Sequence, residues 1–102
     1  MVLYDIPQAT GFHVLAQAAG NVATIDSFAG LAAPGKTIAG YLVTPSLLKP
    51  LASAFAAAKP ETFAYPGLTP GKPVTKAVYG WVMDSSGQVS LSKQATVRFG
   101  NP

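Results

Sequence analysis

The chain has 102 residues, of which 49% are hydrophobic and only 11% are charged, with a formal net charge of +3 and no cysteine. This length suits a single domain (residues 1–102), and the lack of cysteine excludes disulfides and thiolate metal sites. The cations are scattered, whereas nucleic-acid-binding proteins gather them into a patch, so we expect no nucleic-acid partner. Soluble domains usually carry ~25% charged residues. So low a charge content predicts that neighbouring protein covers part of the surface.

The N-terminal quarter contains an uncharged stretch, residues 6–25, with about the length of a membrane span. Its polar residues, among them Gln8, His13 and Asn21, make it too polar to cross a bilayer. A secretory signal needs a basic start, and the first basic residue is Lys36. We therefore expect no targeting segment and no membrane partner.

The first half of the chain alternates between strand-like, helix-like and turn-like segments. Val2–Pro7 has extended character, and Thr10–Gly20 has the spacing of a short helix. The apolar residues that would share one face of this helix are Phe12, Leu15, Ala16 and Ala19. Asn21–Phe28 has the alternation of a strand, and Gly30–Gly35 has the composition of a loop. Thr37–Thr44 predicts a second strand, which a proline ends.

The middle of the chain is rich in alanine, proline and glycine. Its leucines and alanines suit a helix, but Pro50 interrupts the pattern, so we predict a short helix over Pro50–Ala58 only. Lys59–Pro73 is rich in proline and glycine, which indicates a long surface loop.

The last third of the chain predicts a β-hairpin. Val74–Met83 is rich in valine and aromatic residues, and Val89–Phe99 alternates apolar with polar residues. Ser85–Gly87 forms the turn, with glycine at the left-handed position, and Asp84 lies where its side chain can bond back to the backbone. We therefore predict a mainly β (α+β) domain: a small antiparallel β-sandwich or barrel-like sheet with one or two short helices.

The turn also predicts the register of the hairpin. It places Trp81 opposite Leu91 and Tyr79 opposite Lys93, so that the two aromatic residues face the core. The reverse face then carries three valines opposite polar residues. We hypothesise that this face and the proline-rich loop contact another subunit. The candidate interface residues are Val74, Val78, Val82, Pro66, Pro70 and Lys72.

One segment, Gly30–Thr37 (GLAAPGKT), satisfies the phosphate-binding pattern G-x-x-x-x-G-K-[ST]. That chemistry needs a helix directly after the loop, so that backbone N–H groups point at the phosphate. Here the loop is followed by strand-like residues, so we interpret the match as a coincidence and expect no nucleotide binding. Lys36 is then expected to be a solvated loop cation, and Asp84 a turn residue.

The other residues that could carry chemistry are isolated in the sequence. His13 is the only histidine, and it has no nearby partner residue for catalysis or metal binding. The acidic residues are far apart: Asp5, Asp26, Glu61 and Asp84. We therefore expect no catalytic residues, no metal site and no cofactor, and we expect that the protein is not an enzyme.

The hairpin carries a family resemblance. Val78–Asp84 (VYGWVMD), followed by Gly87 and a strand ending at Arg98 and Phe99, resembles a hairpin near the C-terminus of small virion proteins of tailed phages. In those proteins a Tyr-Gly-aromatic-Val strand precedes an acidic turn. The resemblance covers the last quarter of the chain, and it implies a structural role on the virus particle, such as capsid decoration or a small tail component.

These observations lead to a main expectation and one alternative. We expect a non-enzymatic virion structural protein, a capsid decoration (cement) protein that acts in many copies and forms homo-oligomers or part of a large assembly. Its expected partners are the major capsid protein or copies of itself, and its expected location is the virion, assembled in the host cytoplasm. The alternative is a small ligand- or carbohydrate-binding β module with Tyr41, Tyr79 and Trp81 as an aromatic platform, which an exposed Trp81 would favour.

Overall fold

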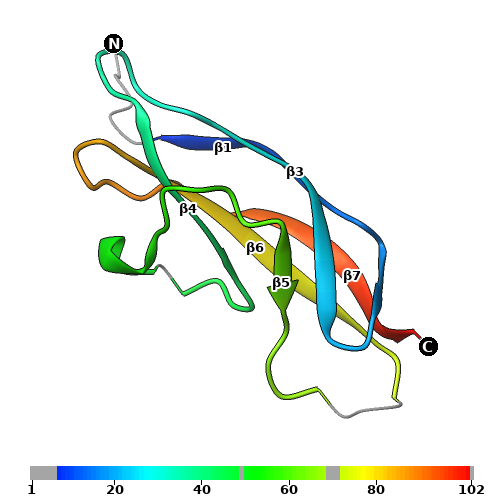
Figure 1. The fold of residues 1–102 in the computed structure, drawn as a ribbon. Helices are drawn as coiled ribbons and strands as arrows, with labels where there is room; N and C mark the ends of the chain where they lie inside the picture. The colour runs from blue at the N-terminus through cyan, green and yellow to red at the C-terminus, as the bar shows by residue number, and fades with distance from the viewer. Residues whose placement is uncertain (1–6, 49, 69–71, 102) are drawn as a thin grey trace.

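The computed structural model describes residues 7–48, 50–68 and 72–101, and these residues form two packed β-sheets (Figure 1). The elements in chain order are β1 (Gln8–Val14), β2 (Gln17–Ala19), β3 (Val22–Leu31), β4 (Ile38–Thr44), the 3-10 turn η1 (Ala52–Ala54), β5 (Thr62–Ala64), β6 (Val74–Asp84) and β7 (Lys93–Asn101). The molecule is elongated, with extents of 50 × 22 × 22 Å. The prediction of a small, mainly β sandwich is therefore confirmed.

Strands that follow one another in the chain often lie in different sheets. One sheet has the order β1-β3-β5 and is antiparallel, and the other has the order β2-β7-β6-β4, with β2 parallel to β7. The chain passes from one sheet to the other directly after β1: the Leu15 amide still bonds to Thr24, whereas the Ala16 carbonyl already accepts from Arg98. In strand order, this arrangement resembles the immunoglobulin-type sandwich.

The core lies between the two sheets and is dense at its centre. The buried side chains of Phe12 and Phe28 come from β1 and β3, and their ring centroids are 4.9 Å apart. Gly80 of β6 lies directly beneath Phe12, where a Cβ atom would come within 2.7 Å of the ring. The absence of a side chain at this position lets the two sheets approach each other closely.

The predicted helices are not formed. Thr10–Gly20 contains β1 and β2, because buried Phe12 and Val14 flank exposed His13 with the period of a strand. The helical spacing was misleading because β1 has register irregularities and then changes sheet, which shifts its apolar residues out of simple alternation. Within Pro50–Ala58, only η1 is helical.

The other predicted segments agree more closely with the structure. The strands expected at Asn21–Phe28 and Thr37–Thr44 are β3 and β4, although β3 continues into the expected loop as far as Leu31. β5 interrupts the loop expected over Lys59–Pro73. The extended segment expected at Val2–Pro7 lies outside the described residues, except for Pro7.

The β6–β7 hairpin and its turn are confirmed, but its register differs from the prediction. Gly87 has a φ of 89°, and Met83 pairs with Val89 as the turn requires. Farther from the turn, Gly80 pairs with Lys93, so β7 has gained one residue relative to β6. Tyr79 therefore lies opposite Gln94 and not opposite Lys93.

This shift of one residue places the valine face of β6 in the hydrophobic core, together with Val97 and Phe99. Val97 and Phe99 now lie on the same face as Val74 and Val78, whose register partners are Phe99 and Ala95. Leu91, which was expected to face Trp81 in the core, is instead 77% exposed. Val97 and Phe99 are both 0% exposed.

Candidate functional site

The valines predicted to form the interface belong to the core of the chain itself. Val78 and Val82 are 0% exposed, and Val74 is half-buried. The opposite sheet covers them closely, because a Cβ atom on Gly30 would lie 2.9 Å from Val82 Cγ1. The hypothesis that this face meets another subunit is therefore wrong for Val78 and Val82.

The remaining interface candidates lie in the loop that follows β5. Pro66 and Lys72 are exposed, and Pro70 lies outside the described residues. Gly67, with a φ of 77°, completes a turn with Pro66. Their contact with another subunit stays a prediction.

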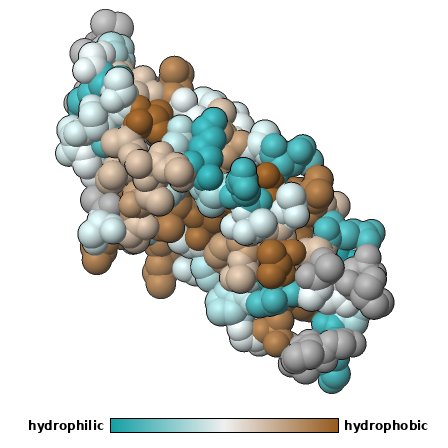
Figure 2. All heavy atoms as spheres, viewed as in Figure 1, coloured by the Kyte–Doolittle hydropathy of each residue, from teal (hydrophilic) through white to brown (hydrophobic). Residues whose placement is uncertain are grey.

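The structure instead exposes three leucines between β4 and η1, in the segment Pro45–Leu51, which we call the leucine loop. Leu47 is 64% exposed, Leu48 is 80% exposed and Leu51 is 76% exposed. Figure 2 shows apolar side chains protruding at the lower left of the molecule, on the side where η1 lies. Isolated exposed leucines are ordinary, but three within five residues form a cluster that is typical of contact surfaces.

Contacts at both ends of the leucine loop fix its direction away from the core. At its start, Thr44 Oγ1 donates a 2.8 Å hydrogen bond to the Ser46 carbonyl and accepts one of 2.8 Å from Trp81 Nε1. Beyond its end, Ala56 pairs with Tyr41 through two backbone hydrogen bonds of 2.8 and 3.1 Å. Because the chain after η1 fills the space beside β4, the leucines have no place on the sheet.

The sequence on either side of the leucine loop contains basic residues but no acidic residue. The nearest basic residues in the sequence are Lys49 and Lys59, and residues 27–60 contain no aspartate or glutamate. The Lys59 ammonium lies 5.6 Å from the centroid of the Tyr41 ring, a cation–π contact that holds it beside β4. The leucine loop is thus suited to a partner surface that is apolar with an acidic border.

The phosphate-binding pattern does not form a phosphate cradle. Residues 33–36 make a turn, with the Lys36 amide bonded to the Ala33 carbonyl, and the next element is β4 and not a helix. Lys36 is not a fully solvated cation as expected, because its Nζ lies 3.8 Å from Oδ2 of the completely buried Asp84. The two residues instead join the loop after β3 to the β6–β7 turn.

Asp84 is the centre of that junction. Its Oδ1 accepts hydrogen bonds from the Ser86 amide (2.9 Å), the Ser86 hydroxyl (2.7 Å) and the Gln88 amide (3.0 Å). Burial by itself raises the pKa of Asp84, but these hydrogen bonds and the charge of Lys36 outweigh it, so the pKa lies below its ordinary value. The expectation that Asp84 bonds back to the turn is confirmed.

The aromatic platform of the alternative hypothesis is not assembled. Trp81 is only 4% exposed, and its indole N–H is used by Thr44. Tyr41 packs edge-on against Phe28, with ring centroids 5.3 Å apart. The prediction that Trp81 is buried is confirmed, although it lies on the opposite face of β6 from Val78.

The structure brings two of the other candidate groups, His13 and Asp26, together. His13 Nδ1 lies 3.0 Å from Asp26 Oδ2 on the exposed face of the first sheet. Among the residues that the structure describes, no three histidine, cysteine or carboxylate side chains gather as metal ligands would, and no helix is long and apolar enough to cross a membrane.

No family model, curated protein or solved structure matches the chain. The functional argument therefore depends on the surface of this molecule and on the resemblance of its hairpin.

Sequence reasoning missed the leucine loop because it assigned these leucines to the neighbourhood of a helix. The signal was present in the two prolines. Pro45 ends β4, and Pro50 prevents a helix from beginning early enough to bury Leu47 and Leu48. Because Leu47 and Leu48 lie between these two prolines, they continue neither a strand nor a helix, and their side chains are exposed.

Proposed function

We propose that this protein is a non-enzymatic structural protein of a virus particle, a capsid decoration protein of a tailed phage that acts in many copies. In this proposal the leucine loop attaches it to the major capsid protein, and the copies contact one another through other surfaces. The observation that carries the proposal is the exposure of Leu47, Leu48 and Leu51, each more than 60% accessible on a domain with only 11% charged residues. The resemblance of the hairpin to small virion proteins supports the choice of a virus particle as the assembly.

The magnitude of leucine burial supports attachment in many copies. Burying one leucine side chain contributes roughly 1.5–3 kcal/mol, so the leucine loop would supply on the order of 5 kcal/mol. Association costs about 4–15 kcal/mol in lost translational and rotational freedom. A single loop would therefore bind weakly. Copies held side by side on a particle, with contacts to one another as well, would share that cost.

The proposal is tested by removing the apolar surface of the leucine loop without disturbing the core. The variant Leu47→Ser, Leu48→Ser and Leu51→Ser should keep the circular dichroism spectrum of the wild type, because all three side chains are exposed. It should lose co-sedimentation with the parent particle. The matched control is Leu15→Ser with Leu91→Ser, which removes two exposed leucines (43% and 77%) outside the loop. Wild-type occupancy of the triple variant would contradict the proposal.

A further inference from the structure

The strand β3 extends well beyond its neighbour β5. β5 pairs only with Val22–Thr24, and one further bond joins the Ile25 amide to the Glu61 carbonyl. Along Asp26–Leu31, β3 has β1 on one side, and the described residues supply no strand on the other side. Figure 1 shows this difference in length between β3 and β5. The sheet therefore has a free edge, Asp26–Leu31, in the middle of the molecule.

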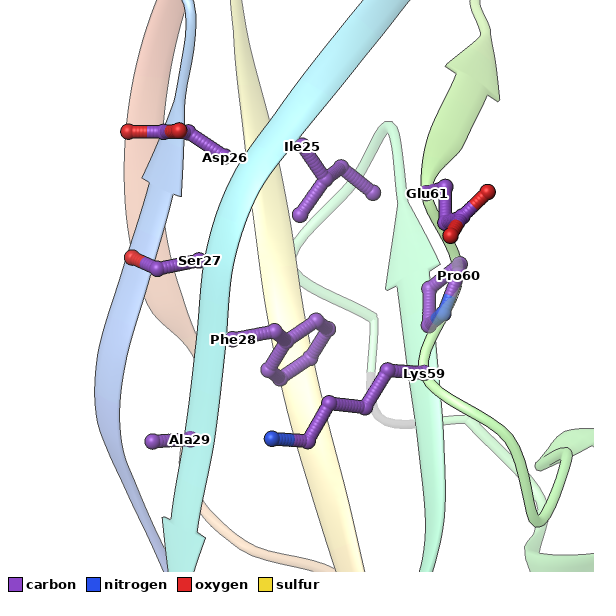
Figure 3. Close-up of a pocket in the computed structure, with 8 residues that line it drawn as sticks. All are labelled: Ile25, Asp26, Ser27, Phe28, Ala29, Lys59, Pro60 and Glu61. Atoms are coloured by element: carbon purple, nitrogen blue, oxygen red, sulfur yellow. The ribbon is translucent and has the colours of Figure 1, made fainter.

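A groove runs beside this free edge. It has a volume of about 450 Å³ and lies between β3 and the segment Lys59–Glu61. In Figure 3, the side chains of Ile25 and Phe28 point towards the inside of the sandwich, and the Lys59 side chain extends across towards Phe28. The volume is within the range of ~300–1,000 Å³ that is usual for binding sites.

The shape and chemistry of the groove suit an extended peptide. A free strand edge offers a row of backbone donors and acceptors, which another strand satisfies most completely. The apolar floor of Ile25 and Phe28 favours apolar side chains on one face of that strand. Three charged side chains line the groove, Lys59, Asp26 and Glu61, and among them Lys59 offers the one position for a carboxylate.

We propose that the free edge Asp26–Leu31 binds residues Val2–Ile6 of a second copy of the chain as an added strand. This segment, Val-Leu-Tyr-Asp-Ile, combines β-branched, aromatic and aliphatic residues with a single carboxylate, Asp5, which fits Lys59. Its five residues would span about 17 Å as a strand, which matches the roughly 20 Å of the free edge.

The position of Gln8 favours a second copy over the same chain as the source of the strand. Gln8 pairs with Leu31 on the side of β3 that faces β1, opposite to the groove. Pro7 is completely buried there. To reach its own groove, the chain would have to cross the end of β3 within Ile6 and Pro7. A neighbouring molecule can supply the segment without this reversal, and mutual exchange would give a closed dimer.

The decisive experiment uses cross-linking, because the chain has no cysteine of its own. Full-length Leu3→Cys is mixed with full-length Ser27→Cys, whose position lines the groove, and oxidised at several concentrations. Adjacent strands place Cα atoms about 5 Å apart, within the range of a disulfide. The mixed dimer should form at least fivefold more than in a control mixture of Leu3→Cys with Thr10→Cys, an exposed position on β1. Equal yields would overturn the proposal.

Sedimentation of the full-length chain gives a second, independent readout. Wild type should associate as its concentration rises, and Leu3→Pro should raise the dissociation constant at least tenfold, because proline removes a donor from the added strand. Asp5→Lys and Lys59→Glu should each raise it about threefold, and the double variant should restore it. A wild type that stays monomeric at every concentration would overturn the proposal.

This inference goes beyond the proposed function and does not depend on the leucine loop. The leucine-to-serine variants should self-associate as wild type does. The two proposals therefore fail separately: loss of attachment to a particle tests the leucine loop, and loss of the mixed cross-link tests the free edge.

Discussion

Removing the carboxylate of Asp84 should destabilise the whole domain, because this side chain joins two loops at one end of the sandwich. Oδ1 accepts three hydrogen bonds, and Oδ2 faces the Lys36 ammonium at 3.8 Å. Hydrogen bonds to a charged acceptor contribute roughly 1.5–3 kcal/mol each. Removing the group also recovers the several kcal/mol that its burial costs. We expect Asp84→Ala to lower the free energy of unfolding by about 2–4 kcal/mol, a large part of the ~5–15 kcal/mol of a typical domain.

The isosteric variant Asp84→Asn separates charge from shape. Its carbonyl oxygen can still accept the bonds from Ser86 and Gln88, but as a neutral acceptor, and the attraction to Lys36 is lost. The expected cost is about 1–2 kcal/mol at pH 7. The pH dependence is more specific: because folding lowers the pKa of Asp84, its contribution is complete above the pKa of the unfolded chain and is lost as pH falls through the lower, folded value.

The assay is urea unfolding followed by the fluorescence of Trp81, at neutral pH and at steps through the acid range. Wild type should lose stability as pH falls below about 4, and Asp84→Asn should lose less over the same range. The control is Asp26→Asn, whose carboxylate is exposed and whose change should stay within about 0.5 kcal/mol. If Asp84→Asn is as mild as this control and keeps the wild-type pH profile, then the carboxylate does not hold the two loops together.

Three further predictions follow from the core and the phosphate-like loop. Val78→Asp should unfold the domain, because it buries an unpaired charge, and circular dichroism measures this. The control Val22→Asp, at a site 44% exposed, should stay folded. A folded Val78→Asp variant would show that Val78 is not part of the core. Trp81→Ala should lower the free energy of unfolding by ~3–5 kcal/mol in urea titrations, and a cost under about 1 kcal/mol would contradict its burial. Calorimetry with ATP and magnesium should give no saturable heat for wild type or Lys36→Ala. Saturable heat for wild type that disappears in Lys36→Ala would show that the segment Gly30–Thr37 binds nucleotide.

The sequence was sufficient to predict strands from alternation or from β-branched and aromatic content. β3 and β7 were predicted from alternation, although β7 begins at Lys93 and not at Val89, and β6 was predicted from its valines and aromatic residues. The strand β4 was also predicted, and the turn at Asp84–Gly87 followed from local backbone chemistry. Such features depend on residues close together in the chain. β1 could not be predicted, because its apolar residues are displaced by register irregularities and by a change of sheet that only the complete fold imposes.

The register of the hairpin illustrates a different limit. The turn fixes the pairing of Met83 with Val89, but Gly80 pairs with Lys93, and between these two pairs Leu91 bridges to Gln8 of β1. The register of the hairpin thus changes where β7 meets a distant part of the chain, which the sequence of the hairpin alone does not show. For the same reason, the valine interface was a reasonable inference from the sequence and was still wrong, and the leucine loop became visible only when the space beside β4 was known to be filled.

The parallel pairing of β2 with β7 has a mechanical consequence. Figure 1 places the start of β1 and the end of β7 towards opposite ends of the long axis. Tension between them would pull β2 and β7 in opposite directions along their length, so the bonds from the Arg98 amide to Ala16 and from the Gly100 amide to Gly20 would be loaded together and not one after the other. Rupture under force is governed by the unfolding rate. A domain tethered at both ends would therefore resist stretching more than its modest size suggests.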